Sequence, residues 1–86
     1  MELRTNAGYT ITDSITIGDT EFVLGVGKEA PDPYVTWQCS NGNYYFWGHY
    51  TSNLVAAKKD LLERAGDALE RQIKRQEKKP AEKEER

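Results

Sequence analysis

Residues 34–50, YVTWQCSNGNYYFWGHY, decide how the sheet of this protein is built, and residues 44–50 alone hold five of its nine Phe, Trp and Tyr side chains. Asn41-Gly42 predicts a β-hairpin with a two-residue loop, because both residues tolerate the positive φ that such a turn requires. This loop fixes the register. It places Trp47 opposite Thr36, Tyr45 opposite Gln38, and His49 opposite Tyr34.

Side chains alternate between the two faces of a strand, so the register also sorts this hairpin into two faces. One face carries Val35, Trp37, Cys39, Tyr44, Phe46 and Gly48. The other carries Tyr34, Thr36, Gln38, Tyr45, Trp47 and His49. We expect the first face to join the core and the second to face solvent.

Residues 9–26, YTITDSITIGDTEFVLGV, predict a second hairpin that turns at Gly18-Asp19. A two-residue loop pairs Ile17 with Thr20, Ile15 with Phe22, Asp13 with Leu24, and Ile11 with Val26. The large apolar residues other than Val23 then share one face, which is typical of a half-buried antiparallel sheet. Asp13 interrupts that series and indicates a bulge or a position at the rim of the sheet.

After Tyr50 the spacing of apolar residues becomes helical, and we expect a helix from about residue 52 to residue 79, capped by Thr51 or Ser52. The polar pair Asp60/Arg64 is expected on its solvent side. Its apolar stripe contains Leu54, Leu61, Leu62, Ala65, Leu69 and Ile73.

The sequence therefore predicts an α+β fold, with a small antiparallel β-sheet of two hairpins, about four strands, covered on one face by a long C-terminal α-helix. Residues 1–8 are expected to form an N-terminal extension, residues 9–79 a single ββββα domain, and residues 80–86 a charged, disordered tail. The order of the strands stays open.

The helix is expected to be longer than the sheet. It would span roughly 40 Å, whereas strands of eight residues reach only about 26 Å. Its last turns, with Leu69 and Ile73, should run past the sheet, where these two side chains could contact another molecule.

Composition limits the classes of function. A lone cysteine excludes an intramolecular disulfide, and no stretch is long and apolar enough to span a bilayer, so we expect a cytoplasmic protein that does not enter the membrane. Residues 1–57 carry two basic and six acidic residues, whereas residues 58–86 carry ten basic and eight acidic ones. The aromatic residues thus lie in the acidic half, which argues against a nucleic-acid partner because acidic side chains repel the phosphates.

Catalysis is not expected. Cys39 and His49 are the only thiol and imidazole, and the predicted register puts them on opposite faces, so they cannot act as nucleophile and base or share a metal ion. We predict no catalytic residue, no metal site and no cofactor.

A face with Tyr34, Tyr45, Trp47 and His49 would be an unusually aromatic surface. We expect a non-enzymatic module in which these four residues bind a protein partner or mediate self-association, with Leu69 and Ile73 as a further contact on the helix. Two alternatives are base stacking by a nucleic-acid-associated accessory protein, with Lys and Arg of the helix, and simple cross-strand packing.

Three stretches, ITIGDTEFVLGV, PYVTWQCSNGNYYFWGHY and AAKKDLLERA, give the chain a resemblance over roughly residues 9–70. It resembles small uncharacterised proteins carried by conjugative and transposable elements of gut Gram-positive bacteria. The resemblance brings no catalytic or binding motif. It implies a cytoplasmic accessory protein of a mobile element that acts on a host or element-encoded protein.

Overall fold

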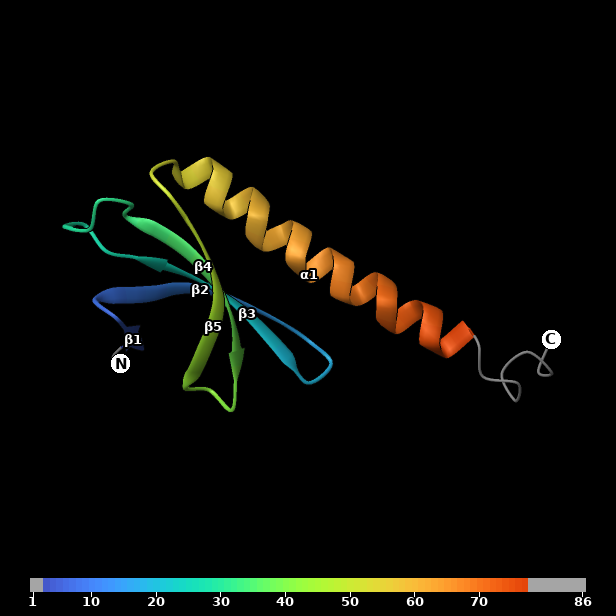
Figure 1. Ribbon diagram of the computed structural model, residues 1–86. Coiled ribbons are helices and arrows are strands. Elements are labelled where there is room, and N and C mark those ends of the chain that lie inside the picture. Colours follow the sequence, from blue (N-terminus) through green and yellow to red (C-terminus); the bar gives the residue numbers. More distant parts are fainter. Residues whose placement is uncertain (1–2, 78–86) are drawn as a thin grey trace.

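The computed structural model describes residues 3–77, which form a five-stranded antiparallel sheet and one helix (Figure 1). The strands follow the chain in the order β1-β2-β3-β4-β5. The elements are β1 (Thr5–Asn6), β2 (Tyr9–Ile17), β3 (Thr20–Val26), β4 (Tyr34–Ser40), β5 (Tyr44–Thr51) and α1 (Leu54–Glu77). The predicted α+β class is confirmed. The fifth strand is β1, which lies within residues 1–8, whereas the predicted tail, 80–86, falls outside the described residues.

The β2–β3 hairpin keeps its predicted register only as far as the middle of β2. Ile15 faces Phe22 and Asp13 faces Leu24, as expected, but Ile11 pairs with Gly25 and not with Val26. The difference is a bulge at Thr12, where one extra residue in β2 reverses the faces of the side chains that precede it. The first half of β2 therefore directs its apolar residues to the other side of the sheet.

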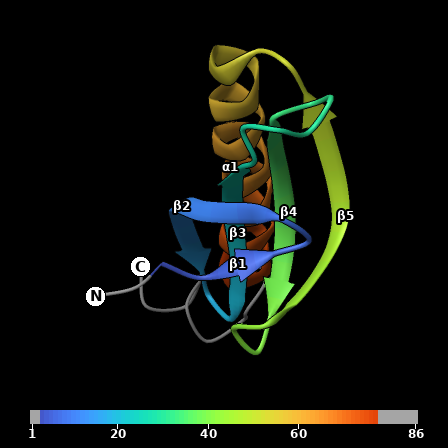
Figure 2. The same cartoon turned by 90° about the vertical axis from the view of Figure 1, so that its left-hand side faces the viewer.

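This reversal accompanies a strong curl of the sheet. In Figure 2, β1 and the first half of β2 cross the face of β3 and β4 that lies opposite α1. Two apolar clusters result. Between sheet and helix lie Phe22, Leu24, Ala57, Leu61 and Ala65, and inside the curl lie Tyr9, Ile11, Val23, Val35, Trp37 and Cys39. The expectation of one core face and one solvent face is therefore wrong, because the curl covers the second face.

An ion pair fastens the curled N-terminal segment to the sheet. The Arg4 guanidinium donates to both carboxylate oxygens of Glu21 on β3, at 2.6 and 3.2 Å, and to the carbonyl oxygen of Gly42 at 3.2 Å. The hydrogen bonds from Arg4 hold the pKa of Glu21 below its ordinary value, although partial burial opposes them. A bidentate guanidinium–carboxylate pair fixes orientation as well as distance.

The β4–β5 hairpin differs from the predicted one at its loop. The loop has three residues, Asn41 to Asn43, so that Ser40 pairs with Tyr44 and Cys39 with Tyr45. A second irregularity at Trp47 and Gly48 shifts the register again and pairs Thr36 with His49. The predicted partners of Trp47, Tyr45 and His49 are therefore all wrong.

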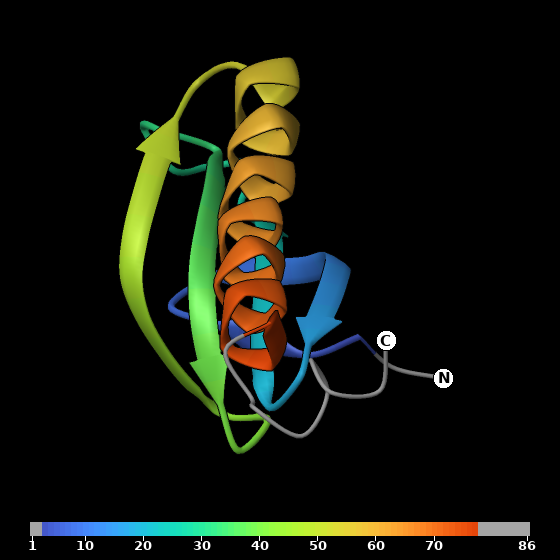
Figure 3. The ribbon, with the colours of Figure 1, turned by 90° about the vertical axis from the view of Figure 1, so that its right-hand side faces the viewer.

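Helix α1 begins at Leu54, one or two residues after the start that a cap at Ser52 or Thr51 would give. The side-chain oxygen of Asn53 accepts a hydrogen bond from the backbone N–H of Ala56 at 3.0 Å, which makes Asn53 the N-cap in place of Thr51 or Ser52. The C-terminal turns of α1 run past the strands, as predicted (Figure 1), and leave Leu69 and Ile73 exposed. Viewed from the other side, α1 lies along one face of the sheet only (Figure 3).

The buried stripe of α1 is built from small residues around one leucine. Ala57, Leu61 and Ala65 are buried, whereas Leu62, which the sequence placed in the same stripe, points outward. Leu61 is 4% exposed and Leu62 62% exposed. Consecutive helical residues point about 100° apart, so only one of the two leucines can face the sheet.

We therefore expect Leu61→Ala to lower the free energy of unfolding by about 2–5 kcal/mol, since it leaves a cavity between α1 and the sheet. Leu62→Ala is the matched control, and its effect should stay within about 0.5 kcal/mol. Urea unfolding of dilute protein measures both. Equal losses for the two variants would contradict the observed orientation of the helix.

Candidate functional site

The four residues predicted to form one aromatic face do not lie together. Tyr34 packs against the cluster beneath α1, whereas Tyr45 packs against the cluster inside the curl, where its ring centre lies 5.5 Å from that of Trp37. Trp47 and His49 remain exposed on β5. The predicted site therefore divides, and of its four residues only Trp47 and His49 are exposed.

A different set of rings is exposed on β5. Tyr44 is 63% exposed, Trp47 is 69% exposed, and the half-buried Phe46 lies between them. Its ring centre is 5.1 Å from that of Tyr44 and 5.0 Å from that of Trp47, the latter in an edge-to-face arrangement. We call Tyr44, Phe46 and Trp47 the β5 aromatic surface. This surface lies on β5, an edge strand of the sheet, so one side of the β5 backbone pairs with no strand among residues 3–77.

Trp47 has a left-handed backbone conformation, with φ at 57°. Such a conformation costs a bulky residue on the order of 1–3 kcal/mol and occurs where surrounding contacts enforce it. Here it belongs to the bulge opposite Trp37. Gly48 has no room for a side chain, because a Cβ there would lie 2.8 Å from the Trp37 indole nitrogen. Bulges on edge strands redirect a side chain, and this one turns the indole of Trp47 outward.

Arg64 of α1 holds this bulge in place. Its guanidinium donates to the carbonyl oxygen of Trp47 at 2.7 Å, and to the carbonyl and hydroxyl oxygens of Thr36 at 3.0 and 3.1 Å. Thr36 lies on β4 next to the bulge and is fully buried. The Arg64 side chain therefore joins the carbonyl group of Trp47 on β5 to Thr36 on the neighbouring strand β4.

Asp60, one turn earlier on α1, completes the polar contact between helix and sheet. The Thr36 hydroxyl donates to the Asp60 carboxylate, and His49 Nδ1 lies 2.9 Å from the same oxygen. Burial alone would raise the pKa of Asp60, but the hydrogen bonds from Thr36 and His49 outweigh it and hold that pKa below its ordinary value. Asp60 and Arg64 were predicted on the solvent side, and that prediction is wrong.

The Thr36–Asp60–His49 arrangement does not form an activated nucleophile. In a hydroxyl nucleophile site the imidazole stands between the hydroxyl and the carboxylate, so that it can take the hydroxyl proton. Here the carboxylate stands between the other two groups, and Thr36 is inaccessible to a substrate. The arrangement instead fixes the position of β5 relative to α1.

Cys39 is also poorly placed for chemistry. It is buried inside the curl, and burial raises the pKa of its thiol. A thiolate is the reactive form, so burial suppresses its reactivity. Residues 3–77 contain no group of three or more His, Cys, Asp or Glu that could hold a metal ion.

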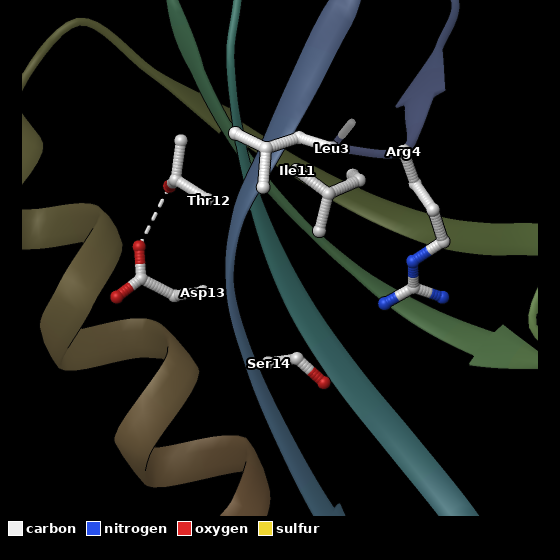
Figure 4. A pocket seen from close by; sticks show the side chains of 6 residues that line it. All are labelled: Leu3, Arg4, Ile11, Thr12, Asp13 and Ser14. Atoms are coloured by element: carbon white, nitrogen blue, oxygen red, sulfur yellow. Dashed lines mark hydrogen bonds between the residues drawn. The ribbon is translucent and has the colours of Figure 1, made fainter. Parts of the chain in front are cut away.

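One open cavity of about 230 Å³ lies at the bulge of β2, lined by Leu3, Arg4, Ile11, Thr12, Asp13 and Ser14. Figure 4 shows Thr12 and Asp13 directed to each other on one side of β2, with Arg4 on the other side. The Thr12 hydroxyl donates to the Asp13 carboxylate at 2.6 Å, and the Arg4 guanidinium is engaged by Glu21. This cavity offers a ligand little that is not already paired.

Comparisons of the chain with protein-family profiles, curated proteins and solved structures found no match. Within the described part of the chain, no helix is long and apolar enough to cross a membrane. The β5 aromatic surface, held by Thr36, Asp60 and Arg64, is therefore the candidate site on its geometry alone. Sequence reasoning found Trp47 but missed the polar support, which comes from residues distant in the chain.

The lowered pKa of Asp60 predicts how the helix–sheet contact depends on pH. Because the folded-state pKa lies below the ordinary value of 3.8, the charged form stabilises the fold above that pH, and the contribution is lost as pH falls through the lowered pKa. The stability difference between wild type and Asp60→Asn should therefore shrink as pH falls from about 5 to about 2.

Denaturant unfolding at a series of pH values measures this difference. The exposed Asp67, two turns along the same helix, gives the matched control Asp67→Asn, which reports the effect of removing one charge from α1. If the difference in unfolding free energy between wild type and Asp60→Asn increased toward low pH, it would contradict the observed hydrogen bonds.

Proposed function

We propose that this protein is a non-enzymatic protein-interaction module whose contact surface is the β5 aromatic surface. The observation that carries the proposal is Trp47, held in a strained left-handed conformation by Arg64 with its indole exposed. Strain of this kind tends to be retained at functional sites. A strand with an unpaired edge and an outward tryptophan offers a partner both backbone hydrogen bonds and an apolar anchor.

The chemistry of the surface fits a protein partner. Trp and Tyr are preferred anchors at protein–protein interfaces, since they bury large areas while ordering few torsions. Residues 33–57 contain no Asp, Glu, Lys or Arg, so covering β5 would bury no charged side chain of that strand. The fully buried centre of an interface is typically depleted of charge in the same way.

Nucleic acid is the less favoured partner. Base stacking on exposed rings requires nearby cations that bind the phosphates. β5 supplies none, and the guanidinium of Arg64 is already bound to Trp47 and Thr36. The role as an accessory protein of a mobile element rests on the resemblance described above and stays a prediction.

The proposal predicts that removing the Trp47 ring weakens partner binding without unfolding the protein. Trp47→Asn is the best variant, because asparagine tolerates positive φ better than most residues. For a partner isolated with the wild-type chain and purified, the dissociation constant should rise at least about tenfold, as at an interface hot spot. Isothermal titration measures it.

Leu3→Ala, which removes an exposed apolar side chain from the N-terminal segment, is the matched control and should leave the affinity unchanged. An unchanged affinity for Trp47→Asn would overturn the β5 aromatic surface as the contact. Retention of an oligonucleotide in a filter-binding assay at low salt, lost with Trp47→Asn, would favour base stacking instead.

A further inference from the structure

Helix α1 presents a second apolar stripe that the sheet does not use. Val55, Leu62, Leu69 and Ile73 are all exposed, whereas Ala57, Leu61 and Ala65 face the sheet. Together with Lys59 and Gly66, the exposed residues recur at alternating intervals of four and three along α1. This is the spacing of residues at a helix–helix seam, and at 100° per residue the set occupies one narrow face of α1. We call residues 55, 59, 62, 66, 69 and 73 the outer stripe.

We propose that the outer stripe binds the outer stripe of a second copy of this chain, with the two helices antiparallel about a two-fold axis level with residue 64. This surface is separate from the β5 aromatic surface. The spacing of the stripe is symmetric about that level. Val55 and Ile73 lie equally far from it, as do Lys59 and Leu69, and so do Leu62 and Gly66. An isologous interface requires this kind of match between a surface and itself.

Gly66 supplies the space that the pairing needs. A Cβ built at Gly66 would meet no atom within 4 Å beyond the backbone of its own helical turns, and its φ is not positive. Glycine weakens an exposed helix relative to alanine, and nothing within the described fold requires it at this position. In the antiparallel pair, the side chain of Leu62 lies over Gly66 of the second copy. A large residue opposite a small one allows the two helices to approach closely.

Charge distinguishes the antiparallel arrangement from the parallel one. Lys59 and Glu70 lie on the same flank of the stripe, so antiparallel packing brings Lys59 beside Glu70 of the second copy. Parallel packing would bring Lys59 beside Lys58 of the second copy, which is repulsive. Glu63 of the two copies approaches the axis, but each is compensated by its own Lys59, at 3.2 Å.

Sedimentation equilibrium of the full chain over a range of concentrations tests the proposal. We expect a reversible dimer whose dissociation constant rises at least about tenfold in Leu62→Glu. Gly66→Leu is the sharper variant. It adds a good helix former in open space, so the monomer should melt at a higher temperature, yet the dimer should weaken because Leu62 of the second copy can no longer approach.

A charge swap tests the orientation. Lys59→Glu should weaken the dimer, and the double variant Lys59→Glu/Glu70→Lys should recover part of the affinity. A wild-type chain that is monomeric at every concentration would overturn the proposal, and a dimer strengthened by Gly66→Leu would overturn the antiparallel packing. Trp47→Asn should leave the dimer intact. A dimer lost in Trp47→Asn but kept in Leu62→Glu would move self-association to β5 and overturn the outer stripe.

Discussion

The structure depends on the burial of β3 from both sides. Phe22, Val23 and Leu24 are consecutive and all buried, although neighbouring side chains on a strand point to opposite faces. A single helix can cover only one of those faces. The second face of β3 is covered because of the bulge at Thr12. The bulge turns Ile11 and Tyr9 over that face and allows the sheet to curl around Val23 and Trp37.

The curl determines which aromatic residues remain free. Trp37 is buried inside the curl and Tyr45 packs against the cluster there, whereas Tyr34 packs against the cluster beneath α1. On β5 the bulge at Trp47 and Gly48 accommodates Trp37 on the inner side and directs the Trp47 indole outward. The same bulge therefore makes room for Trp37 in the core and exposes Trp47, and Arg64 of α1 stabilises it.

The helix has two roles in this arrangement. Its inner face of small residues allows close approach to the sheet, and Asp60 and Arg64 on the same side bind Thr36. Its outer stripe has no such role in the described fold, which is why the spacing of Val55, Leu62, Gly66, Leu69 and Ile73 points to a second chain. Two independent surfaces would allow one copy to self-associate and still bind a partner.

The sequence by itself determined the α+β class, the two hairpins and the C-terminal helix, and Asp13 indicated a bulge or a rim position in β2, because turn residues and the spacing of apolar residues act over short distances. Tertiary structure decided the rest. A three-residue loop in place of a two-residue one moves Tyr44, Tyr45 and Phe46 to the opposite face, and the bulge at Trp47 and Gly48 returns His49 to the face of Thr36. The continuous apolar run in β3 was the available signal for two-sided burial. The contacts of Thr36 with Asp60 and Arg64 join residues more than twenty positions apart, and only packing of the helix on the sheet brings them together.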